Sequence, residues 1–450
     1  QNLDLSKINT SAVLSARKVF FIGIGGIGIS AIARMMFLEG KEVLGSDMSE
    51  NEITKELKNL GIKIIIGQDF EFIPKDIDLI IYTIAIPDYD IKFFEQIRNS
   101  GFLYKSYPQM LHYLTEDKYT IAISGTHGKT TTTAMIAQIL CDTKNDPTVI
   151  VGSLLIPNNI AKSSQGSNFI AGKSKYFVVE ACEYRRSFLN INPKILVITN
   201  IEEDHLDYYK DIEDIKDAFH ELCMKVPKDG FVVCNPRDKN ISEVIKNINA
   251  KVVNYYDFFD ENLKLKIPGI HNKKNAAIAI ALSNILDIDK NISKKTLENF
   301  QGTWRRLEYK GKTTTGTIVY DDYAHHPTEV KASLSGLREL YPKGQKEITV
   351  LFQPHLYSRT KALFNEFVTC FDEADRILFL PIYFAREKPI PEISSDKLAF
   401  IIKKHKLEVE SFSDFGSAEE YIKNLDFGKD DIFVTMGAGE AYKVSDKIFK

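Results

Sequence analysis

The stretch Ile121-Ala-Ile-Ser-Gly-Thr-His-Gly-Lys-Thr-Thr-Thr-Thr133 decides the fold class, because an apolar run passes directly into a glycine turn, a lysine and a row of hydroxyl groups. A strand that ends in such a turn before a helix is how α/β proteins bind the phosphates of a nucleotide. The glycines free backbone N–H groups, and the helix directs its positive end toward the anion. The sequence therefore predicts a triphosphate-binding loop made of Gly125, Thr126, His127, Gly128, Lys129, Thr130 and Thr131.

Two side chains of this loop have separate chemical tasks. Lys129 is placed to reach the outer phosphates, and the hydroxyl of Thr130 is placed to ligate Mg²⁺. The common phosphate-loop pattern separates its glycines by four residues and has a glycine where Ile123 stands here. The shorter spacing restricts the loop to fewer families of nucleotide-binding proteins.

Composition and charge indicate a large protein that is not attracted to nucleic acid or to an anionic membrane. The 450 residues are 44% hydrophobic, which suggests roughly three domains of about 150 residues each. The 58 basic residues nearly balance the 61 acidic ones, and the net charge is -3. We therefore expect small-molecule substrates, no nucleic-acid or membrane partner, and a monomer or a homodimer.

The cysteines predict a reducing, cytoplasmic environment. Their number is odd and no two have CxxC spacing, so neither a disulfide framework nor a zinc knuckle is expected from Cys141, Cys182, Cys223, Cys234 and Cys370. The apolar run 19–33 resembles a signal peptide, but it is glycine-rich and too short to span a bilayer. No transmembrane segment is expected.

Strand and helix patterns alternate along the chain and divide it into three regions. Strands are predicted at 19–24, 42–46, 63–67, 79–83, 176–180, 195–200, 231–235, 317–320, 348–352, 376–380 and 432–436. Helices are predicted between them, for example at 29–39, 52–60 and 275–285. This alternation predicts an α/β fold with mostly parallel sheets, in domains bounded at 1–117, 118–301 and 302–450.

A second glycine-rich turn, Gly23-Ile-Gly-Gly-Ile-Gly28, lies between a predicted strand and a predicted helix. Asp47 ends the next strand, at about the roughly 20-residue distance of a dinucleotide fingerprint. By itself this pattern favours NAD. However, the same geometry binds any pyrophosphate and a second nucleotide site follows at Gly125, so the diphosphate of a UDP-sugar fits equally well.

Histidines and carboxylates gather at the ends of predicted strands. The histidines in question are His127, His205, His271, His325, His326 and His355. Glu180 and His205 each follow an apolar strand, so both lie at the sheet edge where open α/β folds bind ligands. With Thr130 they could surround divalent ions beside a triphosphate. Because Mg²⁺ prefers oxygen ligands, the histidine makes Mn²⁺ a candidate substitute, and a purely hydrogen-bonding role for His205 stays open.

The chain resembles the Mur ligase family over nearly its whole length. Behind GIGGIGISAIA, the motifs follow in one order: GTHGKTTT from Gly125, EACEYRRSFL from Glu180, TNIEEDHLDYY from Thr199, PGIHNKKNAAIAIA from Pro268, YDDYAHHPTEV from Tyr320, FQPHLYSRT from Phe352 and MGAGE from Met436. This order is far more specific than any single motif.

The resemblance implies an ATP-dependent, amide-bond-forming ligase of peptidoglycan synthesis. It implies an N-terminal Rossmann-like domain for a UDP-sugar, a central phosphate-loop ATPase and a C-terminal Rossmann-like domain. The motifs fit the branch that joins L-alanine to the lactyl carboxylate of UDP-N-acetylmuramate. There, ATP phosphorylates the carboxylate, the amine attacks the acyl phosphate, and ADP and phosphate leave. ATP and Mg²⁺ are the expected cofactors.

The resemblance also implies roles for individual residues. Catalysis is expected from Lys129, Glu180, His205 and His325, and metal binding from Thr130, Glu180 and His205. Besides the phosphate loop, ATP is expected to contact a loop with His271, Asn272 and Asn275, and to contact Arg306 and Asp322. The UDP-sugar is expected at Gly23, Gly25, Gly26, Ile27, Gly28, Asp47, Thr83 and Ala85. The amino acid is expected at Tyr323, His325, His355 and Arg359.

Three positions depart from the family pattern. Leu356 stands where many members have arginine, so Arg359 would have to pair with the alanine carboxylate alone. Cys182 stands where many have aspartate, which makes Arg185 and Arg186 alternative anion contacts. Glu440 replaces a commoner aspartate, and nothing in the sequence explains this change.

Other functions remain as alternatives. A related ligase reattaches a recycled peptide to UDP-N-acetylmuramate, although the segment 353–360 favours the alanine-adding branch. Outside the family, an NAD-dependent dehydrogenase fused to an ATPase would bind NADH in its first domain. A nonenzymatic nucleotide switch would release phosphate without depending on L-alanine.

Overall fold

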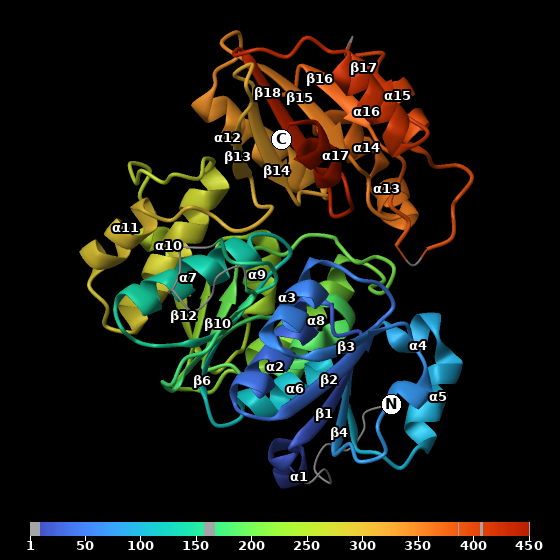
Figure 1. Cartoon of the computed structure of the whole chain (residues 1–450). Helices are drawn as coiled ribbons and strands as arrows, with labels where there is room; N and C mark the ends of the chain where they lie inside the picture. Colours follow the sequence, from blue (N-terminus) through green and yellow to red (C-terminus); the bar gives the residue numbers. More distant parts are fainter. Residues whose placement is uncertain (1–9, 157–166, 386, 406–407, 450) are drawn as a thin grey trace. The chain divides into compact units, whose positions relative to one another are not determined.

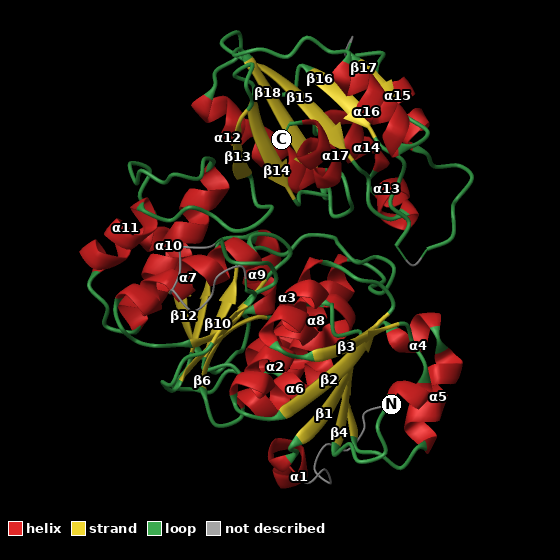
Figure 2. Ribbon diagram, viewed as in Figure 1, coloured by secondary structure: helices red, strands yellow, loops and turns green. Residues whose placement is uncertain are grey.

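A computed structural model describes residues 10–156, 167–385, 387–405 and 408–449. Within these residues, three β-sheets carry helices on their faces, and each sheet comes from a different part of the chain (Figures 1 and 2). The predicted three-domain α/β class is therefore confirmed. None of the described helices is long and apolar enough to cross a membrane.

The described residues form two compact units. The first contains those of Gln1–Gly125, Thr132–Ile201 and Lys216–Asn254. The second contains those of Thr126–Thr131, Glu202–Ile215 and Tyr255–Lys450. The turn of the phosphate loop after Gly125 thus groups with the C-terminal part of the chain.

The first sheet is entirely parallel, with the order β3-β2-β1-β4-β5. Its strands are β1 (Lys18–Ile22), β2 (Glu42–Asp47), β3 (Lys63–Ile66), β4 (Leu79–Tyr82) and β5 (Tyr104–Ser106). Its helices are α1 (Thr10–Ser15), α2 (Ile27–Leu38), α3 (Glu52–Leu60), α4 (Ile86–Tyr89), α5 (Ile91–Asn99) and α6 (Tyr107–Thr115). Because the order reverses between β1 and β4, the turns after these strands flank the crevice where open α/β sheets bind ligands.

Local signals and apolar packing build this first domain. Asn51 begins α3 by accepting the Thr54 N–H, and Gly61, with a φ of 107°, ends it. On one face of the sheet, Phe20 of β1 packs with Phe93 and Ile97 of α5, and each is at most 5% exposed. Burial of such side chains contributes about 2 kcal/mol each to folding.

The second sheet has the order β12-β11-β10-β6-β9-β7-β8. Its strands are β6 (Tyr119–Ser124), β7 (Thr148–Ile150), β8 (Phe169–Ile170), β9 (Tyr176–Glu180), β10 (Ile195–Ile198), β11 (Phe231–Cys234) and β12 (Lys251–Asn254). Between these strands in the sequence lie the helices α7 (Lys129–Asp142), α8 (Ile212–Met224) and α9 (Lys239–Val244). The helices α10 (Ile270–Ile285) and α11 (Lys290–Glu298) follow β12 in the sequence and belong to the second unit. All neighbours are parallel except β7 and β8. Strand β6 lies between β10 and β9. Gly125, which directly follows β6, and Glu180, the last residue of β9, therefore lie at the ends of neighbouring strands.

The third sheet has the order β13-β14-β18-β15-β16-β17, and only β13 is antiparallel to its neighbour. Its strands are β13 (Glu308–Lys312), β14 (Ile318–Asp322), β15 (Glu347–Phe352), β16 (Arg376–Phe379), β17 (Val409–Ser411) and β18 (Asp431–Met436). Apolar residues of α12 (Pro327–Leu340), α14 (Phe364–Thr369) and α15 (Ser395–Ile402) cover one face. Those of α16 (Phe415–Lys423) and α17 (Tyr442–Ile448) cover the other, and α13 (Tyr357–Ala362) follows β15.

The structure corrects some predicted element boundaries. Helix α10 begins at Ile270 instead of Asn275, since Gly269 adopts a φ of 101° and the helix follows directly. Strand β14 continues to Asp322, beyond its predicted end at Tyr320. The short strands β5, β7, β8, β12, β13 and β17 were not predicted. Strands β5, β7, β8 and β17 have only two or three residues, too few for a periodic pattern. Strands β12 and β13 have no fully buried residue, so they lack the continuous apolar run of the strands that were predicted.

A buried ion pair joins the start of the third domain to the loop after β18. The Nε of Arg305 donates to Oδ2 of Asp321 at 2.8 Å, and the two residues are 3% and 1% exposed. The same guanidinium donates to the carbonyl oxygens of Gly437 at 2.7 Å and Gly439 at 3.1 Å. Its carbon lies 4.4 Å from the centroid of the Tyr442 ring. One side chain thus holds three segments of this domain together.

We predict that Arg305→Met destabilises the third domain strongly. The substitution leaves the Asp321 carboxylate buried without its cation, which costs about 3–5 kcal/mol. Thermal unfolding should show a Tm lower by roughly 10 °C for a domain of this size. The control is Arg376→Met, whose partner Glu408 is 54% exposed, and it should cost at most about 1 kcal/mol. Equal shifts for the two variants would contradict the prediction.

Candidate functional site

The glycine turn after β1 has the shape of a phosphate-binding turn. Gly23 has a φ of 74°, and a Cβ on it would lie 2.5 Å from the Thr83 side chain. The N–H of Gly25 donates to Oδ2 of Asp47 at 2.8 Å. Thr83 and Asp47, both predicted for the UDP-sugar site, therefore lie against the turn. In this structure Asp47 holds the turn itself.

Of the remaining predicted UDP-sugar residues, Gly26, Ile27 and Gly28 lie at the start of α2. A Cβ on Gly28 would lie 2.6 Å from the Tyr107 ring, so this side chain closes the space beside the helix. The amide of Asn168 donates to the carbonyl of Ile27 and, at 2.9 Å, to the hydroxyl of Ser30. Gly26 is the residue before α2, and Ala85 is the residue before α4. Tyr107 and Asn168 were not predicted for this site. Both are far from the glycine turn in the sequence, and only the folding of the chain brings them to it.

Glu180 is the last residue of β9, and a hydrogen bond from the backbone fixes the position of its carboxylate. Oε2 of Glu180 accepts the N–H of Gly152 at 2.7 Å, and a Cβ on Gly152 would lie 2.5 Å from this carboxylate. Gly125 belongs to the same unit and has a φ of 128°, a conformation that favours glycine. A Cβ on Gly125 would lie 2.0 Å from the hydroxyl of Thr199. Close packing and a positive φ thus require glycine at position 125, whereas a side chain at position 152 would displace the Glu180 carboxylate.

The phosphate loop packs against helix α10. Gly128 has a φ of 81°, and a Cβ on it would lie 2.8 Å from Oδ1 of Asn275. Nζ of Lys129 donates to the carbonyl of Thr126 at 3.1 Å, so the lysine is folded over its own loop. The hydroxyl of Thr126 accepts the N–H of Glu202 at 2.9 Å. The helix predicted after the glycine turn is present: α7 begins at Lys129.

The adenine candidates lie on the first turns of α10 and not on a loop, which corrects the sequence-based expectation. Asn272 donates to the carbonyl of Pro268 at 2.7 Å, and Asn275 donates to Oδ1 of Asn272 at 3.3 Å. His271 lies beside them, and burial lowers the pKa of its imidazole to about 4. The helix fixes the spacing of these side chains, so the amides are oriented before any base arrives.

Arg306 and Asp322 lie at the edge of the third sheet. Nη2 of Arg306 donates to the hydroxyl of Thr130 at 3.3 Å, which links it to the phosphate loop. Asp322 accepts hydrogen bonds from the Ser333 hydroxyl and from the N–H of Ala324. Burial raises the pKa of Asp322 to about 6. In this structure Asp322 therefore secures α12 and the turn after β14.

The four predicted amino-acid residues come together in one cluster. The His325 ring lies 5.4 Å from the Tyr323 ring and 5.7 Å from the His355 ring, centroid to centroid. Nη1 of Arg359 donates to Nδ1 of His355 at 3.0 Å. Tyr383, which was not predicted, stacks on His355 with ring centroids 5.5 Å apart. Residues from the loops after β14, β15 and β16 and from helix α13 thus build one cluster of aromatic rings and a guanidinium.

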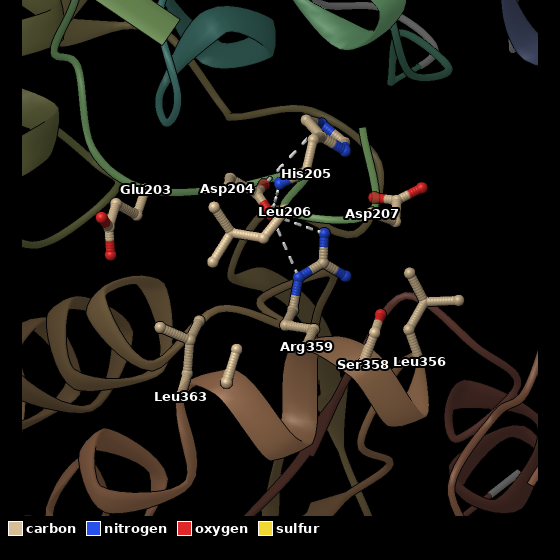
Figure 3. A pocket seen from close by; sticks show the side chains of 10 residues that line it. Glu203, Asp204, His205, Leu206, Asp207, Leu356, Ser358, Arg359 and Leu363 are labelled. Atoms are coloured by element: carbon tan, nitrogen blue, oxygen red, sulfur yellow. Dashed lines mark hydrogen bonds and ion pairs between the residues drawn. The ribbon is translucent and has the colours of Figure 1, made fainter. Parts of the chain in front are cut away.

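Arg359 lines a pocket with carboxylates on its opposite wall, as Figure 3 shows. Its Nη2 and Nε donate to Oδ1 of Asp204 at 2.8 Å and 3.2 Å. Burial raises the pKa of the Asp204 carboxyl, but the charges of Arg359, His205 and His325, with the hydrogen bond from Arg359, together outweigh it and hold the pKa below its usual range. His205 lines the same pocket and has a φ of 53°, a conformation sparsely used by residues other than glycine. The predicted metal-binding histidine and the predicted alanine-binding arginine therefore share one pocket.

Leu356 gives this pocket an apolar side. Its side chain is 3% exposed and its backbone has a φ of 69°. Leu363 and Ala362 also line the pocket. The position that carries arginine in many family members thus contributes packing in this chain and no charge.

A network of histidines and carboxylates, missed by sequence reasoning, surrounds His127. Its Nδ1 lies 3.2 Å from Oε1 of Glu329, and its Nε2 lies 3.5 Å from Oε2 of Glu202. Burial lowers the pKa of His127, but the hydrogen bonds to Glu202 and Glu329 outweigh it and raise the pKa to about 9. The ring of His326 lies 4.7 Å away, centroid to centroid. His127 is therefore a cation between two carboxylates at neutral pH.

The predicted metal ligands suit Mg²⁺ or Mn²⁺ in chemistry: a hydroxyl of Thr130, a carboxylate of Glu180 and an imidazole of His205. Thr130 follows Gly128, whose positive φ of 81° allows the sharp turn that a phosphate-binding loop needs. Glu180 belongs to the first unit, whereas Thr130 and His205 belong to the second. Their joint binding of a metal remains a prediction.

These features define a class of protein. Three α/β domains, a glycine-lysine-threonine loop opening a helix, and a pocket of arginine, histidine and carboxylates indicate an enzyme that uses a nucleotide on an anionic substrate. Residues 18–119 match the Mur ligase family, catalytic domain; 123–262 match the Mur ligase middle domain; and 305–439 match the Mur ligase, glutamate ligase domain. The chain belongs to the Mur ligase family, whose members are ATP-dependent, amide-bond-forming ligases.

Known relatives are similar over nearly the whole chain. A UDP-N-acetylmuramate–L-alanine ligase of Clostridium perfringens is 37% identical over 460 residues, which cover 96% of this chain and 98% of the relative. That of Caldicellulosiruptor saccharolyticus is 40% identical over 468 residues, with coverage of 96% and 98%. The crystal structure of the UDP-N-acetylmuramate-alanine ligase MurC from Thermotoga maritima matches with a TM-score of 0.78 and 27% identity, covering 96% of this chain and 98% of that one.

Proposed function

We propose that the protein joins L-alanine to the lactyl carboxylate of UDP-N-acetylmuramate in peptidoglycan precursor synthesis, with conversion of ATP to ADP and phosphate. The observation that carries the proposal is 37% to 40% identity, over 96% of the chain, to ligases of this name. All five cysteines are free thiols, which fits a reaction in the reducing cytoplasm.

The chemistry proceeds in two transfers. An oxygen of the lactyl carboxylate attacks the γ-phosphorus of ATP, and the bond to ADP breaks. The nitrogen of L-alanine then attacks the acyl carbon, the bond from this carbon to the phosphate oxygen breaks, and the amine gives up a proton. Activation is needed because an amide does not form favourably from a carboxylate in water, where carboxylate and ammonium are both well solvated.

We assign the nucleotide end of the reaction to the phosphate loop and α10. The Lys129 ammonium neutralises the outer phosphates, and Arg306, beside Thr130, adds a second positive group. Asn272 and Asn275 offer amide donors and acceptors to a base edge. Thr130 would hold one divalent ion at the phosphates, and Glu180 and His205 are the residues expected to hold a second one near the carboxylate. Such positive charge would reduce the repulsion between the triphosphate and the carboxylate.

We assign the amino-acid end to Arg359 and His325. The Nδ1–H of His325 donates to the carbonyl of Tyr323 at 2.9 Å, which leaves Nε2 as an acceptor. Burial lowers the pKa of His325 to about 4, so the ring is neutral and Nε2 can accept a hydrogen bond from the alanine amine. The Arg359 guanidinium would pair with the alanine carboxylate. The two groups would orient the amine with its lone pair free to attack.

A substrate-omission assay tests the proposed function. We expect ADP release to require UDP-N-acetylmuramate and L-alanine together, because the acyl phosphate forms on the first and is consumed by the second. The measurement is ADP production, coupled to mass detection of UDP-N-acetylmuramoyl-L-alanine. Undiminished ADP production without L-alanine would contradict the proposal.

A second acceptor separates the two ligase activities within the family. A murein peptide ligase from Psychrobacter arcticus shares the fold, with a TM-score of 0.70 and 21% identity. The same assay is therefore run with a free murein tripeptide in place of L-alanine. We expect a much higher kcat/KM for L-alanine, and the reverse preference would replace the proposed reaction by peptide recycling.

A further inference from the structure

Glu329 belongs to the motif that begins at Tyr320 but was assigned no role from the sequence, and its carboxylate occupies the centre of the His127 network. It is the third residue of α12, and its side chain is 14% exposed. Oε2 accepts the N–H groups of His325 at 3.1 Å and His326 at 3.3 Å. The His326 ring in turn accepts a hydrogen bond from the backbone, so His326 and Glu329 form a capping box at the start of α12. The capping box by itself gives Glu329 a purely structural role.

The other oxygen of Glu329 serves no capping purpose. Oε1 lies 3.2 Å from Nδ1 of His127 and 4.0 Å from Nη1 of Arg306. His127 belongs to the phosphate loop, and Arg306 donates to Thr130 two residues beyond that loop's second glycine. The carboxylate therefore faces two cations that both contact the segment expected to receive the triphosphate.

The negative charge of Glu329 matters for these contacts. Burial raises the pKa of its carboxyl, but the surrounding positive groups, His325 when protonated, His127 and Arg306, hold the pKa well below its ordinary value. On the far side of His127, Glu202 accepts the hydroxyl of Thr328 at 2.9 Å, which links this second carboxylate to α12 as well. His127 thus lies between two carboxylates, that of Glu329 on the first turn of α12 and that of Glu202, which is hydrogen-bonded to the same turn.

We propose that Glu329 is a positioning residue for ATP, whose carboxylate holds His127 and Arg306 and, through them, the phosphate loop in the conformation that receives the triphosphate. It touches no reacting atom. The inference rests on the nucleotide site of the proposed function, but it does not depend on which acceptor the acyl group reaches.

Glu329→Gln separates positioning from capping. A glutamine at the third position of a helix also completes a capping box, so the variant should fold, with a Tm lowered only by the loss of the ion pair to His127. It lacks the negative charge that faces His127 and Arg306. Because a hydrogen bond between charged groups is worth about 1.5–3 kcal/mol, we expect the Kd of a nonhydrolysable ATP analogue and the KM for ATP to rise roughly tenfold to hundredfold. The KM for UDP-N-acetylmuramate should stay unchanged.

Two further variants complete the test. In a His127→Gln background, Glu329→Gln should raise the Kd by clearly less than it does in the wild type, since the His127 contact is already lost and only the longer one to Arg306 remains. Glu298→Gln, at an exposed position of α11, controls for the loss of one negative charge and should leave the Kd unchanged. A wild-type Kd in Glu329→Gln, or full additivity with His127→Gln, would overturn the proposal. Direct titration with the ATP analogue keeps this outcome distinct from failure of the proposed ligation, which the omission assay reports.

Discussion

The Lys129→Ala variant is expected to lose at least about 10³-fold in kcat with no loss of stability. Phosphoryl transfer depends on cations that offset the charge developing on the phosphates, and removal of one such group costs about 10³–10⁵-fold. Lys129 contacts the carbonyl of its own loop at 3.1 Å and is only partly buried, so its side chain contributes little to the core. The measurement is ADP production at saturating substrates, with Tm recorded for the same preparation.

The matched control for this variant is Lys118→Ala. Lys118 is exposed and precedes the same strand, β6, so its removal changes the net charge equally without touching the loop. We expect the control to keep the wild-type kcat. Wild-type turnover in Lys129→Ala would exclude the phosphate-loop assignment, whereas a large drop in Tm would show that the lysine is structural.

The Arg359→Lys variant is expected to raise the KM for L-alanine by roughly tenfold to hundredfold. Arginine carries five N–H donors, and the contacts to Asp204 and His355 occupy three of them, Nε, one on Nη2 and one on Nη1. The two remaining N–H groups can donate to the two oxygens of a second carboxylate. Lysine keeps a charge near Asp204 but cannot form parallel hydrogen bonds, so it loses a charged contact worth about 1.5–3 kcal/mol.

The Arg359→Lys substitution is expected to change the KM of one substrate only. The KM for ATP and that for UDP-N-acetylmuramate should not change, because Arg359 is assigned to the amino acid alone. Lys361→Met, an exposed position of the same short helix α13, removes a neighbouring positive charge and should leave all three KM values unchanged. A parallel rise in all three for Arg359→Lys would instead indicate that the Asp204 contact maintains the pocket as a whole.

Much of the fold could be predicted because the relevant signals are local. Strand β9 begins and ends where the pattern of residues 176–180 predicts, since a buried parallel strand is a continuous apolar run. The two glycine turns were found for the same reason: Gly23, Gly125 and Gly128 all adopt positive φ values, which a side chain disfavours. The start of α10 was missed because Gly269 begins this helix without a side-chain cap, so no capping signal precedes it.

The sequence by itself determined the phosphate loop, the glycine turn after β1, the alternation of strands and helices, and the residue types that gather at strand ends. These depend on backbone preference and on neighbours within a few positions. Only the tertiary structure decided which charges meet. Asp204 pairs with Arg359 across 155 positions, and Glu329 reaches His127 across 202. A carboxylate can form an ion pair with any cation that lies close to it. Which cation lies close is decided by the folding of the whole chain, which buries the two groups together at one sheet edge.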